Sequence, residues 1–434
     1  MKNLLYTNDG TGTYPPSFYA AGINELKHCE PLTGSHHCDV CIVGGGFTGL
    51  SAALHLAQRG YNVKLLEAQR IGFGASGRNG GQVGRGQRCD QDELEQMFGI
   101  DRARELWTIA AHAVELVREL SASEHVDATF HDGILHADHK ARYTEHSRSY
   151  VEKMQQSYNE GDIVFIPPAD IRNHVNSPAY HSGILDKRSG HIDPLQLALG
   201  IGRMAQAAGA SLHEQSCVTK MSSGKKNIIH TDSADITADY VVLACNGYIG
   251  DLHRDVTRRV MPINNYIVAT EPLGPEVQEE IIKGNVAVND TKFVVNYYRF
   301  SDDHRLLFGG TESYSYQFPN DIAEKVRRPL KKIFPQLAQV QLDYAWGGSL
   351  GITRNRLPHY QRYNESVLSL SGFSGHGVAL GTLSGQIAAE TIAGQAERFD
   401  IMSAIPTPAF PGGKILRHPA LVLGMLWYSL RDKL

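Results

Sequence analysis

Hydrophobic and polar positions follow a regular pattern early in the chain. An apolar run of strand length at 39–43 leads into the glycine-rich turn Gly-Gly-Gly-Phe-Thr-Gly at 44–49. The apolar spacing of 50–59 is helical, and Gly60 follows it in the position of a C-terminal cap. A second β-rich run at 61–67 ends in an acid. This order predicts a strand, a helix and a second strand that together form one βαβ unit.

The rest of the chain alternates between helical and strand patterns. Helical periodicity covers 92–121 and 140–160, and a third helix begins at Pro194, with Asp193 as its N-cap. Strands are expected at 129–136, 210–217, 228–231, 236–245, 263–270, 293–300, 305–310 and 366–371. The last strand leads into a glycine turn at 372–377 and a helix at 378–392.

Composition and charge are those of an ordinary globular protein. The 434 residues are too many for one compact core, so about two domains are expected. A net charge of −4 indicates no basic surface for nucleic acid. We see no signal peptide and no apolar stretch of membrane-spanning length. Six scattered cysteines are typical of free thiols in a reducing compartment, so we expect a cytoplasmic protein.

The glycine turn has the spacing of a dinucleotide-binding fingerprint. Gly44 allows the sharp turn out of the first strand, Gly46 lets the backbone approach a pyrophosphate, and Gly49 lets the helix pack on the strand. The pyrophosphate would lie on the free N–H groups of the helix N-terminus. Glu67 ends the second strand, where its carboxylate can accept hydrogen bonds from ribose hydroxyls. An acid at this position argues against NADP.

A second glycine-rich segment, 71–83, follows the βαβ unit. Its small residues cannot build a core, but they let the backbone approach a flat ligand closely. Arg78 and Asn79 could contact a phosphate or the edge of a ring. The alternative is a flexible surface loop, which agrees less well with the apolar residues around it.

The two glycine motifs together resemble the D-amino-acid oxidase and glycine oxidase superfamily of FAD enzymes. Four further segments, 14–20, 297–299 with 305–310, 346–358 and 410–428, extend the similarity over nearly the whole chain. Three of them (14–20, 297–310 and 410–428), with the second glycine motif, most resemble the branch that oxidises gamma-glutamylated diamines. The resemblance implies an α/β fold with a Rossmann-like FAD-binding domain and an inserted antiparallel-sheet substrate domain.

The same resemblance implies discontinuous domains. The FAD-binding domain is expected to comprise 36–90, 186–258 and 342–398, and the substrate domain 91–185 and 259–341. An N-terminal arm, 1–35, is expected to pack against the body or line an entrance. The C-terminal tail, 399–434, contains an apolar run at 420–427 that is too short to span a bilayer and is expected to dock on the body.

The motifs and the resemblance together name the cofactor-binding candidates. The helix at 378–392, which follows the glycine turn at 372–377, is expected to point its N-terminus at the flavin ring, where its dipole would stabilise negative charge. We expect His376 to have a positional role beside the ring. The candidates are Gly44, Gly46, Phe47, Thr48, Gly49, Glu67, Ala75, Ser76, Arg78, Asn79, Gly80, Gly81, Gln82, Val218, Cys245, Asn246, Gly247, Gly348, Gly375, His376, Gly377 and Val378.

Two departures from the superfamily pattern bear on the substrate. Leu350 stands where glycine oxidases carry an arginine that clamps the substrate α-carboxylate, and no cysteine near Gly348 is available to bond the flavin. We therefore expect non-covalent FAD and an alkyl amine with no carboxylate beside the reacting carbon. The substrate candidates are Tyr266, Tyr297, Tyr298, Arg299, Trp346 and Leu350. For each tyrosine, ordinary cross-strand packing is an equal alternative. Arg299 is expected to hold a distal carboxylate.

Two groups of potential metal ligands were considered. Cys38 and Cys41 form a Cys-x-x-Cys, but no second pair exists to complete a site. His131, His136 and His139 are expected to face different ways on a strand and loop. We therefore expect no metal.

The expected activity is oxidation of a primary amine to an aldehyde with release of ammonia, and with O2 or another acceptor reoxidising the flavin. No catalytic side chain is named, and the oligomeric state is open. One alternative is an oxidase or dehydrogenase of secondary amines or N-methyl amino acids, against which Leu350 counts. Another is an FAD-dependent RNA-modifying enzyme or a non-catalytic flavoprotein. The acidic charge balance counts against the former, and the presence of both flavin motifs against the latter.

Overall fold

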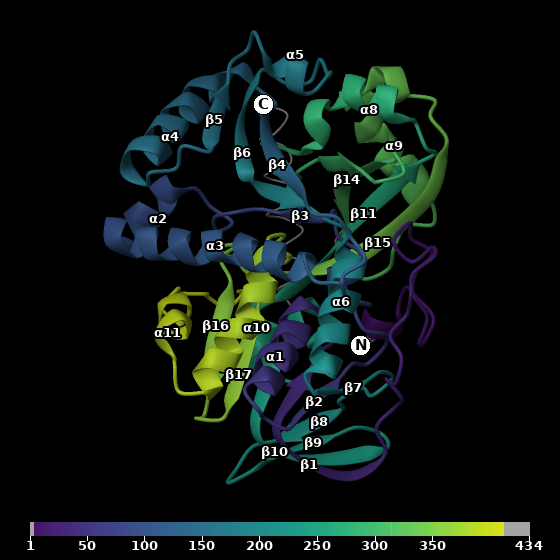
Figure 1. Cartoon of the computed structure of the whole chain (residues 1–434), viewed down its shortest axis with the longest axis vertical. Helices are drawn as coiled ribbons and strands as arrows, with labels where there is room; N and C mark the ends of the chain where they lie inside the picture. The colour runs from purple at the N-terminus through teal and green to yellow at the C-terminus, as the bar shows by residue number, and fades with distance from the viewer. Residues whose placement is uncertain (1–3, 314, 412–434) are drawn as a thin grey trace.

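Two β-sheets, stacked one above the other in Figure 1, organise the chain. The computed structural model describes residues 4–313 and 315–411. The lower sheet carries the βαβ unit predicted at 39–67, and the upper sheet is built from strands that are mostly antiparallel. Helix α3 (Ile100–Ser121) lies across the level where the two parts meet. The predicted combination of a Rossmann-like sheet and a second, inserted sheet is confirmed.

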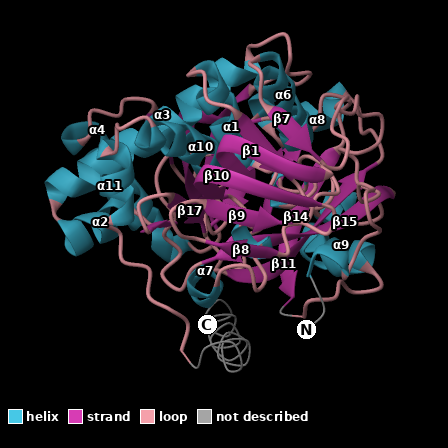
Figure 2. Ribbon diagram, turned by 90° about the horizontal axis from the view of Figure 1, so that it is seen from below, coloured by secondary structure: helices cyan, strands magenta, loops and turns pink. Residues whose placement is uncertain are grey.

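The lower sheet has the order β16-β17-β10-β1-β2-β7, and its five strands from β17 to β7 are parallel. Its strands are β1 (Gly34–Val43), β2 (Val63–Leu66), β7 (Ser211–His213), β10 (Ala234–Leu243), β16 (His359–Tyr363) and β17 (Val367–Ser371). A hairpin of β8 (Lys220–Ser222) and β9 (Asn227–His230) extends from β10. Helices α1 (Phe47–Gln58), α6 (Pro194–Ala207) and α10 (Ala379–Ile392) lie together along one side of the strands (Figure 2).

The upper sheet has the order β15-β11-β14-β13-β12-β4-β6-β3, with β5 paired to β6. Every described pair in it is antiparallel except β12 with β4. Its strands are β3 (Gln82–Val83), β4 (His131–Asp138), β5 (Ile163–Ile166), β6 (Ser182–His191), β11 (Met261–Thr270), β12 (Ala287–Asp290), β13 (Tyr297–Phe300), β14 (Leu306–Ser313) and β15 (Leu342–Ile352).

The remaining helices surround this sheet and the edge of the lower one. They are α2 (Gln91–Phe98), α4 (Thr144–Ser157), α5 (Ile171–His174), α7 (Arg254–Arg259), α8 (Pro275–Ile281), α9 (Ile322–Ile333) and α11 (Glu397–Ser403). The single helix predicted over 92–121 is in fact two, α2 and α3. Gly99 separates them because its φ of 80° lies outside the helical range.

Local signals mark several element ends correctly. The Asp193 carboxylate accepts hydrogen bonds from the N–H groups of Leu195 and Gln196, and Pro194 is the first residue of α6, as predicted.

Sheet membership differs from two predicted domain limits. Strand β6 stays in the upper sheet until His191, past the limit at 186, and β15 forms an edge of the upper sheet although 342–352 was expected in the FAD-binding domain. Strand pairing, which sequence spacing does not encode, decides both.

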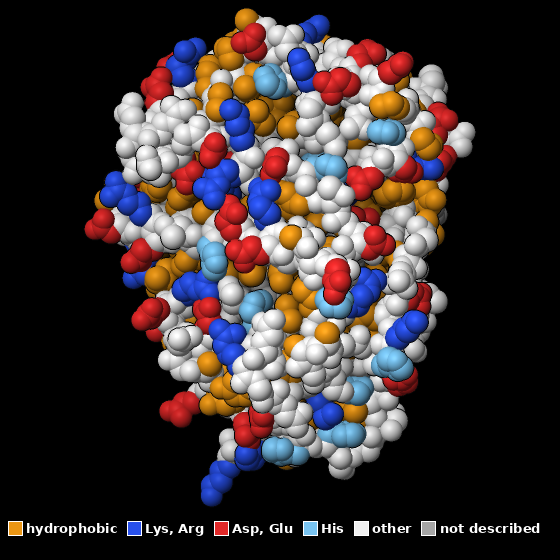
Figure 3. All heavy atoms as spheres, viewed as in Figure 1, with side chains coloured by type: hydrophobic (Ala, Val, Ile, Leu, Met, Phe, Trp, Pro, Cys, Tyr) orange, Lys and Arg blue, Asp and Glu red, His pale blue; other side chains and the backbone are white. Residues whose placement is uncertain are grey.

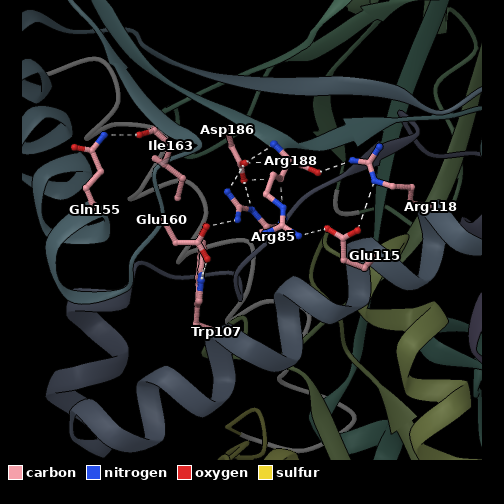
Figure 4. Close-up of polar contacts among 10 residues, drawn as sticks. Arg85, Trp107, Glu115, Arg118, Gln155, Glu160, Ile163, Asp186 and Arg188 are labelled. Carbon is pink, nitrogen blue, oxygen red and sulfur yellow. Dashed lines mark hydrogen bonds and ion pairs between the residues drawn. The ribbon is translucent and has the colours of Figure 1, made fainter.

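A largely buried ionic network ties α3 to the upper sheet (Figure 4). Arg85 donates through Nε and Nη2 to the two carboxylate oxygens of Asp186, at 2.9 and 2.6 Å, and through Nη1 to Glu160 at 2.5 Å. The Trp107 indole N–H donates to the other oxygen of Glu160 at 2.7 Å. The network therefore ties the segment after β3 to α3, β6 and the loop before β5.

The N-terminal arm packs on the body, as predicted. Tyr19 is 2% exposed and meets the Trp346 ring edge-on, and Tyr14 donates a hydrogen bond to the carbonyl of Ile71 at 2.7 Å. The tail run at 420–427 lies outside the described residues. Within 4–313 and 315–411, no helix has both the length and the apolar character needed to cross a membrane. Acidic and basic side chains are interspersed on the face drawn in Figure 3.

Candidate active site

Two adjoining cavities lie where the carboxyl ends of the lower strands approach the upper sheet. One, here called the turn cavity, is lined by the β1–α1 turn, the end of β2 and the segments after β7 and β10. The other, the sheet cavity, is lined by residues of β11, β13, β14 and β15 and by the turn before α10. Their walls share Gly46, Ala75, Ser76, Ala244 and Asn246. The two cavities therefore form one elongated site.

Two glycines of the β1–α1 turn, Gly44 and Gly49, lie where a side chain would not fit. Gly44 has a φ of 109°, and a β-carbon on it would lie 2.8 Å from the carbonyl oxygen of Ala244. A β-carbon on Gly49 would lie 1.9 Å from the carbonyl oxygen of Gly44, so only glycine lets α1 approach the turn this closely. At Gly46 the neighbour is Ser76, whose Oγ also accepts a hydrogen bond from the N–H of Phe47 at 3.0 Å.

Glu67 is held at the floor of the turn cavity. Its Oε2 accepts a hydrogen bond from the N–H of Gly45 at 2.7 Å, and its Oε1 accepts one from the N–H of Gln69 at 2.8 Å. Burial raises the pKa of this carboxyl to about 6, and the two backbone donors oppose that rise. The carboxylate is thus oriented beside the glycine turn, in the position expected for an acceptor of ribose hydroxyls.

The second glycine-rich segment, 71–83, lines the site where the two cavities adjoin. Arg78 donates through Nε to the carbonyl of Phe73 at 2.6 Å and through Nη1 to Asp9 at 2.8 Å, while its Nη2 is buried without a partner. Asn79 turns its amide inward to the carbonyls of Ala75 and Ser76. An unpaired guanidinium N–H in a wall of the site fits an electronegative atom of a bound ligand.

Asn246 joins three segments around the site. Its Oδ1 accepts a hydrogen bond from the N–H of Gly372 at 2.9 Å, and a β-carbon on Gly351 would lie 2.1 Å from the same oxygen. Asn246 itself has a φ of 46°, a conformation that asparagine tolerates better than most residues. The turn at 372–377 then leads into α10, and Gly375, His376, Gly377 and Val378 line the sheet cavity at the start of that helix.

His376 is neutral in this setting. Burial lowers its pKa to about 3, and the nearby positive charge of Arg88 acts in the same direction. A histidine with this pKa carries no charge at neutral pH, which agrees with the predicted positional role.

The structure gathers the predicted cofactor residues at this site. Twenty of the 22 candidates line one cavity or both, namely Gly44, Gly46, Phe47, Thr48, Glu67, Ala75, Ser76, Arg78, Asn79, Gly80, Gln82, Val218, Cys245, Asn246, Gly247, Gly348, Gly375, His376, Gly377 and Val378. The other two lie behind the wall: Gly49 packs on Gly44, and Gly81 on the carbonyl of Ile192. An elongated site with an acid at one end, a helix N-terminus at the other and an unpaired N–H between them fits FAD.

Only two of the six substrate candidates, Tyr297 and Leu350, line the sheet cavity. Tyr298 is buried on the other side of the upper sheet, stacked on Phe308 with ring centroids 5.4 Å apart. Tyr266 is fully buried, and its hydroxyl hydrogen-bonds the Oγ of Ser313 at 2.5 Å. For these two tyrosines the packing alternative agrees with the structure, because alternate side chains along a strand face opposite sides.

The placements of Arg299 and Trp346 argue against the contacts expected of them. Arg299 is 4% exposed and lines neither cavity, and it donates to the carbonyls of Gly80 at 2.8 Å and Ile192 at 3.2 Å. The expectation that it holds a substrate carboxylate is corrected, because Arg299 lies outside both cavities and its Nε, Nη1 and Nη2 all donate to protein oxygens. The Trp346 indole donates to the carbonyl of Arg78 at 3.1 Å, which makes it part of the wall's support.

Four charged residues that line the sheet cavity were not among the predicted site residues: Arg88, Asp290, Glu312 and Arg356. Glu312 lies near the end of β14, and Arg356 follows β15. A charged residue late in an otherwise apolar strand is a weak signal that could have drawn attention to Glu312. Nothing in the spacing of Arg88 and Arg356 indicates that they approach it.

The potential metal ligands are not clustered into a site. In the part of the chain that the structure describes, no group of three or more His, Cys, Asp or Glu side chains could hold a metal ion. Cys38 and Cys41 are both buried in β1, and His136 hydrogen-bonds Asn289. All six cysteines are free thiols.

Comparison with known proteins identifies the family. Residues 39–391 match the family described as DAO, FAD dependent oxidoreductase, and the chain belongs to it. It is 41% identical over 418 residues to a probable oxidoreductase OrdL of Rhizobium meliloti (strain 1021), which covers 96% of this chain and 97% of that one. It is 38% identical over 419 residues to gamma-glutamylputrescine oxidoreductase of Escherichia coli (strain K12), covering 96% and 98%.

Solved structures agree on the fold. Glycine oxidase from Geobacillus kaustophilus superposes with a TM-score of 0.71 at 19% identity, over 83% of this chain and 95% of that one. L-proline dehydrogenase from P. horikoshii gives a TM-score of 0.71 at 20% identity, over 85% and 96%. The family match makes the protein an FAD-dependent oxidoreductase, and these two solved structures share its fold.

Proposed function

We propose that this FAD-dependent oxidoreductase oxidises the primary amine of a gamma-glutamylputrescine-like substrate to an aldehyde and releases ammonia. Its 38% identity to gamma-glutamylputrescine oxidoreductase over nearly the full length of both chains supports this substrate class. The overall reaction consumes the amine, one water and one two-electron acceptor, and yields the aldehyde, ammonia and the reduced acceptor.

The single observation that carries the proposal is the position of Leu350. It lies in the wall of the sheet cavity on β15, two residues after Gly348. The resemblance to glycine oxidases implies an arginine at this position that clamps an α-carboxylate. Leucine offers no charge to such a carboxylate, and burying an unpaired carboxylate beside it would be costly. The wall therefore favours a substrate whose reacting carbon bears only hydrogen and alkyl groups.

The neighbouring side chains prepare the amine for oxidation. A free alkylammonium resembles lysine, with a pKa of about 10.4, and must lose its proton before hydride can leave the α-carbon. Leu350, Tyr297 and Phe293 present apolar and aromatic surface in the same cavity. Removing the ammonium from water into such surroundings lowers its pKa and increases the neutral fraction. Bound FAD would supply the two-electron oxidation itself.

The chain also orients the reacting groups. Gly348 in β15 and the start of α10 face the sheet cavity, and the free N–H groups at the N-terminus of α10 can stabilise negative charge there. Tyr297 is held by the hydrogen bond from its hydroxyl to the Oδ1 of Asn265 at 2.5 Å. No side chain in this set needs to act as a general base if the amine binds in its neutral form.

We further propose that the protein works in the cytoplasm with non-covalent FAD. Six free thiols support a reducing compartment. Strand β15, which carries Gly348, contains no cysteine and therefore offers no thiol to bond the flavin.

An anaerobic flavin-reduction experiment tests the proposed function. The FAD-loaded protein is mixed with gamma-glutamylputrescine, putrescine, spermidine or sarcosine, and the visible flavin absorbance is followed. Rapid bleaching by the glutamylated amine, with one ammonia formed per flavin, is the expected result. Bleaching by sarcosine in its place would favour the secondary-amine alternative. Admission of air, with measurement of hydrogen peroxide, then shows whether O2 is the acceptor.

A further inference from the structure

The sheet cavity contains three charged side chains that have no charged partner of their own. Arg88, Glu312 and Arg356 all line it. Among the described residues none of the three makes an ion pair, and the Oε2 of Glu312 is buried without a hydrogen bond. Elsewhere the chain pairs its buried charges closely, as Arg85 with Asp186. The three side chains are half-buried, and a half-buried charge without a partner is costly, most of all at the buried Oε2 of Glu312, so their retention in a ligand cavity indicates that a ligand supplies the partners.

These groups act on one another electrostatically. Burial raises the pKa of Glu312 to about 7, and Arg356 and Arg88 oppose that rise. Burial lowers the pKa of Arg88 to about 10, and Arg356 lowers it further while Glu312 raises it. The two guanidiniums and the carboxyl therefore face a common space and carry a net positive charge when all three are ionised.

Backbone conformation supports a functional role for Arg356. Its φ of 64° lies in the left-handed region, which is uncommon for a residue other than glycine and costs about 1 kcal/mol or more. Its guanidinium lies over the Phe293 ring, 4.3 Å from the ring centroid. Phe293 lines the same cavity, so the aromatic ring holds the charge at the wall instead of in water.

Strand register gives the distance from this group to the wall around Leu350. Glu312 of β14 pairs with Asn265 of β11, which pairs with Gly348 of β15. Paired residues share one face of a sheet, and neighbouring strands lie about 4.8 Å apart, so the Glu312 and Gly348 backbones are about 10 Å apart. An extended chain covers about 3.6 Å per three bonds, so the nine bonds from the reacting nitrogen to the glutamyl α-carbon span about 11 Å.

Charge and distance together define a ligand group. We propose that Arg88, Arg356 and Glu312 bind the zwitterionic α-amino-acid end of the substrate, with the guanidiniums facing its α-carboxylate and Glu312 facing its α-ammonium. This inference rests on the proposed function, in which the opposite end of the same molecule reacts near Leu350. The three residues are specificity determinants for the head group, at the far end of the substrate from the reacting carbon.

Three unreactive ligands separate the two contacts. Gamma-glutamyl-n-butylamide carries both head-group charges and lacks the reacting amine, glutaryl-n-butylamide keeps only the carboxylate, and 4-aminobutanoyl-n-butylamide keeps only the ammonium. Their dissociation constants are measured by calorimetry on the FAD-loaded protein and on the variants Arg356→Gln, Arg88→Gln and Glu312→Gln. Arg354→Gln is the matched control, because Arg354 is exposed in the same loop and does not line the cavity.

Each variant should weaken one half of the head group. Removing a hydrogen bond to a charged group corresponds to a loss of about tenfold or more. Arg356→Gln and Arg88→Gln should therefore weaken the glutaryl ligand at least about tenfold and the aminobutanoyl ligand by much less. Glu312→Gln should do the opposite. Flavin absorbance and the thermal midpoint of each variant verify that FAD is bound and the chain folded, and Arg356→Lys provides a second variant that keeps the positive charge.

Two results would overturn the inference. Equal dissociation constants in all three variants and the Arg354→Gln control would show that the charged group does not bind the head. A Glu312→Gln variant that binds all three ligands normally, yet reduces its flavin slowly with every amine, would place Glu312 at the reacting amine. Failure of the proposed function would give a different result: gamma-glutamylputrescine would not reduce the flavin of the wild-type protein.

Discussion

The ring of Tyr297 occupies the space that a side chain at Gly309 would need. The two residues are paired across β13 and β14, and a β-carbon built on Gly309 would lie 2.2 Å from the Cζ of Tyr297. Gly80 lies against the same ring, with its own β-carbon position 2.6 Å from the Tyr297 Cδ2. The absence of side chains at these two glycines is therefore what lets an aromatic ring lie flat in the wall of the cavity.

This contact predicts that Gly309→Ala misplaces Tyr297. The new methyl group cannot move, because it is attached to strand backbone, so the ring must leave its position. We expect kcat/KM for gamma-glutamylputrescine to fall at least about tenfold. Tyr297→Phe keeps the ring and loses only the hydrogen bond to Asn265, worth about 1 kcal/mol, so its loss should be nearer fivefold. Gly161→Ala is the control, since nothing lies within 4 Å of its β-carbon position. Equal kinetics for Gly309→Ala and that control would contradict the assignment.

Leu350→Arg should change the class of substrate. The guanidinium would enter the cavity beside Gly348, where it can pair with a carboxylate next to a reacting carbon. We expect slower flavin reduction by gamma-glutamylputrescine, by a factor of ten or more, and measurable reduction by glycine or sarcosine. Leu350→Met, of similar volume and no charge, should stay within a few-fold of wild type. Single-turnover absorbance measurements distinguish these outcomes, and unchanged preference in the arginine variant would count against the proposed role of Leu350.

Loss of Arg85 should destabilise the protein without touching the cavities. Arg85→Met would leave Asp186 and Glu160 buried without their cation, and breaking a buried pair in this way costs about 3–5 kcal/mol. The thermal midpoint should therefore drop by several degrees, while the Kd for FAD of the protein that remains folded changes little. Arg102→Met, which removes an exposed pair with Glu105, should lower stability by no more than about 1 kcal/mol. Similar losses for both variants would contradict a structural role for the network.

Two buried histidines predict a loss of stability in mild acid. Burial lowers the pKa of His191 to about 3 and that of His359 to about 4, and the positive charges of Arg299 and Arg259 act in the same direction. In the unfolded chain both have a pKa of about 6.5. Between pH 6.5 and 4 the unfolded state therefore binds protons that the folded state does not, so stability falls as pH falls.

The slope should be about 1.4 kcal/mol per pH unit for each such histidine. Chemical denaturation at pH 7 and pH 4.5 measures the difference in the free energy of unfolding. In His359→Gln the slope of the unfolding free energy against pH should be smaller by the contribution of one histidine. The same substitution at the exposed His37 should leave that slope as in wild type. A variant at His359 whose pH dependence matches wild type would show that this imidazole is not buried neutral.

Local spacing was enough to predict the βαβ unit and its contacts. Gly44 and Gly49 take the turn and packing positions expected of them, and Glu67 lies beside the glycine turn, because the fingerprint describes a compact piece of chain whose parts meet through one turn and one helix. The N-cap at Asp193 is local in the same sense. The predicted helix over 92–121 missed its break because a single glycine such as Gly99 is tolerated within a helical pattern, whereas in the structure its φ of 80° ends α2.

The sequence by itself determined the cofactor class and the βαβ unit of the Rossmann-like sheet, since the fingerprint depends on contacts within a short stretch. The resemblance to the family added the more distant cofactor candidates. Only the tertiary structure decided which strand residues face the cavity. The alternation of side chains puts Tyr297 in the wall and Tyr298 behind it, although the two are adjacent in the chain. Arg88, Glu312 and Arg356 line one cavity because three segments that are distant in the sequence converge. The pattern of residues along the chain does not indicate contacts between segments so far apart.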